Sequence, residues 1–125
     1  SFPNGLAFGP GGTDLFVAQS LTMTVLRLPW TPAGLGDATP FAKLPKGFPD
    51  GFCLSADGDL YVCGSMGDTV CVFDSDGALK QQIDVPEKTE PTNCCIDDGT
   101  LYVTLSGTGR LVALEVDAEA LPLYR

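Results

Sequence analysis

The sequence predicts an all-β protein, a β-propeller made of three four-stranded blades, and three observations support this prediction. One segment pattern occurs three times along the chain. The strand-like segments are short and rich in β-branched and aromatic residues. Glycine and proline, 15 and 10 of the 125 residues, interrupt the chain too often for long helices. The hydrophobic residues, 44% of the total, are sufficient for the packed core of one domain.

The repeat begins with a short motif that reads Pro-Asn-Gly at 3–5, Pro-Asp-Gly at 49–51 and Pro-Thr-Asn at 91–93. Each motif opens an apolar segment, followed by a glycine-containing turn and a second segment that contains Leu-Phe-Val or Leu-Tyr-Val. Equivalent positions 4, 50 and 92 are 46 and 42 residues apart, which is typical of a propeller blade. A β-sandwich, the main competing fold, predicts no threefold internal copy. The predicted blades cover approximately residues 1–46, 47–88 and 89–125 of a single domain.

Each predicted blade contains two further strands. Third strands are expected at 24–28, 70–73 and 111–116, and weaker fourth strands at 39–44, 79–85 and 120–124. Asp-Gly pairs at 57–58, 76–77 and 98–99 are typical of the tight turns that join such strands. Small residues occupy one register position of the inner strands, as the narrow propeller axis requires: Ala7, Cys53 and Cys95.

The alternating strand direction also predicts which loops share a face. Positions 4, 50 and 92 begin the inner strands, so the loops that follow the second strands return to that same face. The links between blades reach it as well. The predicted site face therefore contains the loops 19–23, 64–68 and 105–109 and the links 46–48 and 87–90.

Composition excludes several classes of function. A formal charge of −9 argues against nucleic acid or an anionic membrane as partner, because like charges repel. No apolar run reaches the roughly 18 residues of a membrane span. The chain opens at Ser1 rather than Met, so a preceding segment is expected to have been removed or left out. No secretory signal follows, and a cytoplasmic location is expected. The five cysteines are expected to be small, reduced core residues, with Cys94 and Cys95 on opposite faces of a strand. With no histidine, the chain contains neither a Cys/His zinc site nor a Ser-His-Asp triad. No residue is assigned to an organic cofactor.

The heads of the inner strands carry the candidate functional residues. Asn4, Asp50 and Thr92 are expected to converge on the axis with their side-chain oxygens directed into the central cavity. Amide and carboxylate oxygens are hard ligands, suited to Ca²⁺, Mg²⁺ or Mn²⁺, and to Zn²⁺ in a less selective site. The following glycines, Gly5 and Gly51, leave room for close approach. In the alternative interpretation, Asn-Gly and Asp-Gly merely mark turns before a strand.

In their order, these motifs resemble the SMP-30/gluconolactonase/regucalcin-like family, and the resemblance covers nearly the whole chain. It implies that the three blades are the C-terminal half of a six-bladed propeller. It further implies that Asn4 is a ligand of a divalent metal, with Ca²⁺ as the first expectation, and that Asp50 is both ligand and general base. The implied reaction is hydrolysis of a lactone, such as the sugar lactone gluconolactone. Thr92 and Asn93 are expected to line this site.

The chain departs from the family pattern in one respect. The family's other ligands, a glutamate near the start and a further asparagine, have no counterpart among these residues. Three blades also leave open sheet faces, so either a missing N-terminal half or a second copy is expected to close a six-bladed ring. Two other functions stay open: a non-catalytic propeller module that binds a small molecule or protein, and a strictosidine-synthase-like relative with different chemistry.

Two other patterns have structural interpretations. Asp74-Ser75-Asp76-Gly77 begins like a calcium loop, but Leu79 and Val85 stand where such a loop needs glycine and glutamate, so a hairpin turn is expected. The large aromatic residues Trp30, Phe41 and Phe48 are expected to pack between blades.

Overall fold

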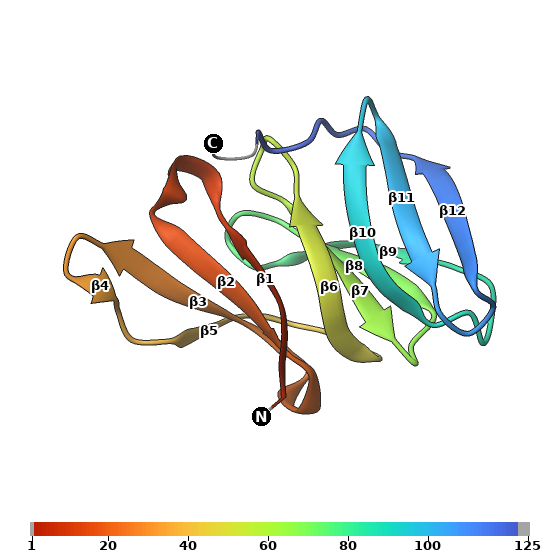
Figure 1. The fold of residues 1–125 in the computed structure, drawn as a ribbon, viewed down its shortest axis with the longest axis horizontal. Helices are drawn as coiled ribbons and strands as arrows, with labels where there is room; N and C mark the ends of the chain where they lie inside the picture. The colour runs from red at the N-terminus through yellow and green to blue at the C-terminus, as the bar shows by residue number, and fades with distance from the viewer. Residues whose placement is uncertain (1, 123–125) are drawn as a thin grey trace.

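The protein is described by a computed structural model that covers residues 2–122, and it consists of three antiparallel sheets side by side (Figure 1). The first sheet has the order β1-β2-β3, and β3 pairs with both β4 and β5. Its strands are β1 (Pro3–Phe8), β2 (Asp14–Gln19), β3 (Thr24–Thr31), β4 (Gly34–Leu35) and β5 (Thr39–Lys43). Two 3₁₀ turns, η1 (Pro10–Gly12) and η2 (Ser20–Thr22), join its first three strands.

The second and third sheets repeat this up-and-down order. The second sheet contains β6 (Phe48–Leu54), β7 (Leu60–Ser65), β8 (Thr69–Phe73) and β9 (Leu79–Asp84). The third contains β10 (Pro91–Asp97), β11 (Thr100–Leu105) and β12 (Arg110–Glu115). The prediction of an all-β protein is confirmed, because every regular element of residues 2–122 other than the two short 3₁₀ turns is a strand.

The prediction of a fourth strand at 120–124 is wrong for the residues that the structure describes. Instead of pairing with β12, the segment after it crosses to the second sheet, where Ala120 forms an isolated bridge with Ser55. The Ala56 amide donates to the Glu119 carbonyl at 2.8 Å, and the Leu121 amide donates to the Leu54 carbonyl at 3.1 Å. These bonds satisfy backbone groups at the end of β6. Residues 123 and 124 of the predicted strand lie outside the described residues.

The hairpin turns follow the predicted Asp-Gly pairs. Between β8 and β9 the Asp74 Oδ1 accepts hydrogen bonds from the amides of Asp76 and Ala78, both at 2.9 Å. Gly77 has φ +84°, a conformation that glycine adopts at no steric cost. The carboxylate that begins this segment is therefore engaged in its own turn, which confirms the hairpin and not the calcium loop.

The core forms two apolar clusters on the two sides of the second sheet. One lies between the first and second sheets and contains Phe16, Phe52 and Phe73. The other lies between the second and third sheets and contains Tyr61 and Leu101. Because both faces of the second sheet are covered, every residue of β8 is buried. No helix among residues 2–122 is long and apolar enough to span a membrane.

The cysteines confirm most of what was expected of them. All five are free thiols, and Cys63, Cys71 and Cys94 are buried. Cys95 is exposed, so its assignment to the core is wrong, while its position on the face opposite Cys94 is confirmed. The reason is the pleat of β10, which turns alternate side chains away from the second sheet.

The aromatic residues differ from one another. Phe41 packs between the first two sheets, with its ring 4.9 Å from that of Phe16, as predicted. Trp30 does not pack between sheets. It contacts Phe8 of its own sheet edge-on at 5.5 Å and remains 47% exposed, because this end of β3 extends beyond the covered part of the sheet. Phe48 lies beside the candidate site described next.

Candidate functional site

The three inner strands lie side by side, with β6 between β1 and β10 (Figure 1). Glycines stand where these strands approach most closely. A Cβ at Gly5 would lie 2.5 Å from the Asp50 carbonyl oxygen. A Cβ at Gly51 would lie 2.3 Å from Oδ1 of Asn93. The second residue of the Asn-Gly and Asp-Gly motifs must therefore be glycine, because a side chain there would collide with the neighbouring strand.

Each inner strand also contains one extra residue relative to its partner. The register shifts between Pro3 and Leu6 in β1, and the same shift occurs in β6 and β10 at equivalent positions: between Pro49 and Phe52, and between Pro91 and Asn93. Such bulges bend a strand and change the direction of its side chains. Their recurrence at one repeat position sets the candidate residues apart from the regular ladder.

All four predicted site residues line one cavity of about 410 Å³. Asn4, Asp50, Thr92 and Asn93 surround it, together with Gly5, Leu6, Gly51 and Phe52. The heads of the three inner strands therefore meet at one cavity. Two of the four are engaged locally: the Thr92 hydroxyl lies 3.0 Å from that of Thr104, and Oδ1 of Asn93 accepts the Cys94 amide at 3.0 Å.

Asp50 is the acidic residue of this cavity. Its partial burial raises the pKa of the carboxyl group above its ordinary value, and a hydrogen bond with the Asn4 side chain acts in the opposite direction. A carboxylate with a raised pKa is a better proton acceptor. The pair therefore combines a carboxyl group with an amide in the lining of one cavity.

The donor set fits a hard cation in part. Asn4 and Asp50 offer the oxygen ligands that Ca²⁺ and Mg²⁺ prefer, but these ions take at least six ligands. Within residues 2–122, no group of three or more His, Cys, Asp and Glu side chains is placed to hold a metal ion. Any further ligands would be water or groups from outside this part of the chain.

Sequence reasoning missed a second, apolar cavity beside the first. It measures about 300 Å³ and shares Asn4 and Asp50 with the polar cavity. Leu21 and Phe48 line it as well. Phe48 was expected between blades, but it begins β6 only two residues before Asp50 and is 37% exposed. Its position next to the Pro-Asp-Gly motif was the available signal.

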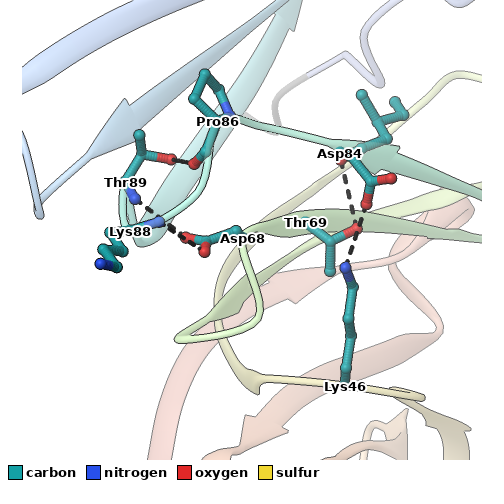
Figure 2. Close-up of polar contacts among 8 residues, drawn as sticks. Lys46, Asp68, Thr69, Asp84, Pro86, Lys88 and Thr89 are labelled. Carbon is teal, nitrogen blue, oxygen red and sulfur yellow. Dashed lines mark hydrogen bonds and ion pairs between the residues drawn. The ribbon is translucent and has the colours of Figure 1, made fainter.

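The loops of the site face are tied to the following links, as Figure 2 shows for Asp68. The Asp68 carboxylate accepts three backbone hydrogen bonds, from the amides of Lys88 at 2.7 Å, Thr89 at 3.0 Å and Glu90 at 3.1 Å. Asp68, Lys88 and Glu90 all have positive φ, between 50° and 60°, a conformation that non-glycine residues rarely adopt. The Asp68 contacts hold this backbone directly before Pro91 and Thr92. Sequence reasoning assigned no role to Asp68.

We expect the stability of the Asp68→Asn variant to depend less on pH in the acidic range than that of the wild-type protein. The three amide donors lower the pKa of Asp68, so its stabilising effect is present above the unfolded pKa of about 3.9 and is lost as pH falls through the folded value. Thermal melting of the complete protein between pH 6 and pH 3 should show a smaller decline in Tm for the variant. Equal declines in the two proteins would contradict this role.

Comparison with known proteins identifies the family to which the chain belongs. The family model described as SMP-30/Gluconolactonase/LRE-like region matches residues 1–107. The chain is 31% identical over 110 residues to the L-arabinolactonase of Azospirillum brasilense, with 85% of this chain and 36% of that protein covered.

Two solved structures show the same fold. The gluconolactonase of Xanthomonas campestris has 37% identity and a TM-score of 0.80, with 90% of this chain and 37% of that chain covered. Regucalcin of Agrobacterium tumefaciens, described as a calcium-binding protein, has 23% identity and a TM-score of 0.82, with 99% and 50% covered. The chain thus spans little more than a third of the two lactonases. Its curled antiparallel sheets match the propeller-like fold of these proteins, and the chain belongs to the SMP-30/gluconolactonase/LRE-like family.

Proposed function

We propose that the chain forms part of a metal-dependent lactone hydrolase. The observation that carries the proposal is the convergence of Asn4 and Asp50 on one cavity at the heads of adjacent bulged strands. The relatives named L-arabinolactonase and gluconolactonase support a lactone as substrate. Substrates of this class are neutral, which is compatible with the chain's charge of −9.

In the proposed reaction, Asp50 is the general base. A carboxylate oxygen of Asp50 takes a proton from water, and the water oxygen bonds to the lactone carbonyl carbon. The ring C–O bond then breaks, and its oxygen receives the proton that Asp50 took from water, so that the open hydroxy acid forms and the Asp50 carboxylate is restored. Thr92 and Asn93 line the cavity, and we propose that their side chains orient the substrate there.

Asn4 and Asp50 would hold the metal through their side-chain oxygens. The regucalcin relative, described as calcium-binding, supports Ca²⁺, and the same oxygen donors would accept Mg²⁺, Mn²⁺ or Zn²⁺. When bound, the ion would polarise the lactone carbonyl and stabilise the negative charge that develops on its oxygen.

We propose that the three sheets are propeller blades and together form half of a six-bladed ring, with boundaries near residues 46 and 88. The first sheet leaves Leu6 66% exposed, and the third leaves Leu111 63% exposed. Such exposed apolar residues favour cover by further blades. The length of the two lactonases supports additional blades in the same polypeptide, and a second copy of the chain is the alternative.

The test is hydrolysis of L-arabinono-1,4-lactone and glucono-1,5-lactone by the complete protein. The release of acid measures the rate of hydrolysis. We expect activity that a chelator removes and that Ca²⁺ restores. Binding of an intact lactone without hydrolysis would overturn the enzyme assignment and indicate a non-catalytic binding module. Hydrolysis that survives exhaustive chelation would overturn the metal dependence.

A further inference from the structure

The candidate site has two compartments of different character. The polar cavity contains Thr92 and Asn93, whereas the apolar cavity of about 300 Å³ contains Leu21 and Phe48. Asn4 and Asp50 line both. A small molecule held at Asp50 therefore has an apolar surface within reach on one side and a polar surface on the other.

The apolar side chains are exposed although they sit on a fixed backbone. Leu21 is 65% exposed and Phe48 is 37% exposed. Leu21 follows Ser20, whose buried hydroxyl donates to the Pro49 carbonyl at 2.8 Å, and whose amide donates to the Phe2 carbonyl at 2.9 Å. Phe48 belongs to β6 and pairs with Ser65 of β7. Both are thus held in place relative to Asp50.

The two apolar side chains lie outside the apolar core. Leu21 belongs to neither core cluster of the described residues, and neither does Phe48. Beside a polar site, exposed apolar residues that share one cavity are typical of a ligand-binding surface, in which a few polar groups fix the orientation of a largely apolar ligand.

We propose that this apolar cavity binds an alkyl substituent of the lactone whose ring is held at Asn4 and Asp50. The inference rests on the proposed function and specifies its substrate class as alkyl-substituted lactones. Apart from Asn4 and Asp50, the only described residues of this lining with polar side chains are Ser20 and Ser65. A polyhydroxylated substituent would therefore leave most of its hydroxyl groups without partners, which is unfavourable. An alkyl chain would instead remove apolar surface from water.

The first experiment compares two six-membered lactones with the complete wild-type protein. δ-Decalactone carries a pentyl substituent, and δ-valerolactone has the same ring without it. We expect a KM about tenfold lower for δ-decalactone. One methylene group enclosed in a hydrophobic pocket favours binding roughly 10- to 200-fold, and an open cavity encloses the pentyl chain only in part. Equal KM values would overturn the inference without involving any variant.

The second experiment replaces the apolar side chains. Leu21→Ser and, separately, Phe48→Ala are expected to raise the ratio of the two KM values, δ-decalactone over δ-valerolactone, by about five- to tenfold. Leu35→Ser is the matched control, because Leu35 is 49% exposed on β4 and lines neither cavity of the site. It should leave the ratio unchanged.

The outcomes separate the two proposals. An unchanged ratio in both variants, with hydrolysis still dependent on Asp50, would overturn the alkyl-binding cavity and leave the lactonase assignment intact. A wild-type protein that hydrolyses none of the sugar and alkyl lactones would overturn the lactonase assignment and the alkyl-binding cavity with it.

Discussion

The Asp50→Asn variant of the complete protein is expected to lose about 100- to 10,000-fold in kcat for lactone hydrolysis. The substitution keeps the size of the side chain but removes the base that would accept the proton of water. It also removes the negative charge of the polar cavity, so Ca²⁺ affinity should fall as well. Initial rates with glucono-1,5-lactone and calorimetric titration with Ca²⁺ measure the two effects.

Asp57→Asn is the matched control for this prediction. Asp57 stands before a glycine, as Asp50 does, but it lies in the turn between β6 and β7, at the other end of the inner strand. It is exposed and lines neither cavity of the site. Its replacement should leave rate and affinity unchanged. Full activity of Asp50→Asn, with normal Ca²⁺ binding, would show that the Asp-Gly motif only shapes the strand.

The Gly51→Ala variant is expected to lower the free energy of unfolding by about 1–3 kcal/mol. The added Cβ would lie 2.3 Å from Oδ1 of Asn93 and 2.7 Å from the Thr92 carbonyl oxygen, so β6 and β10 must separate. The Asn93 oxygen already accepts the Cys94 amide, so its displacement breaks that bond. Urea denaturation of the complete protein measures the loss, and the same separation should reduce lactone hydrolysis.

Gly36→Ala provides the comparison. Gly36 is exposed, and a Cβ there would meet only Pro29 side-chain atoms at 3.4 Å or more, an ordinary van der Waals contact. We expect a change within about 0.5 kcal/mol. A Gly51→Ala protein as stable as the Gly36→Ala protein would mean that the inner strands tolerate separation, and that their close approach does not define the site.

Much of the fold is local and was therefore predictable from the sequence. The Asp-Gly pairs end strands because glycine accepts positive φ, as Gly58, Gly77 and Gly99 all do. In one of these turns Asp74 also accepts hydrogen bonds from nearby amides. The threefold motif predicted the inner strands and the face on which Asn4, Asp50 and Thr92 meet, because strand direction follows directly from the order of turns. These features depend on residues that are neighbours in the chain.

The remaining features depend on partners far apart in the sequence, so only the tertiary structure decided them. Asp68 holds a link about 20 residues away, and Ser20 reaches the carbonyl of Pro49. The segment at Ala120 pairs with Ser55 and not with the adjacent strand. The apolar cavity likewise joins Leu21 of η2 and Phe48 of β6. No local propensity encodes such contacts, because each arises from how three sheets pack against one another.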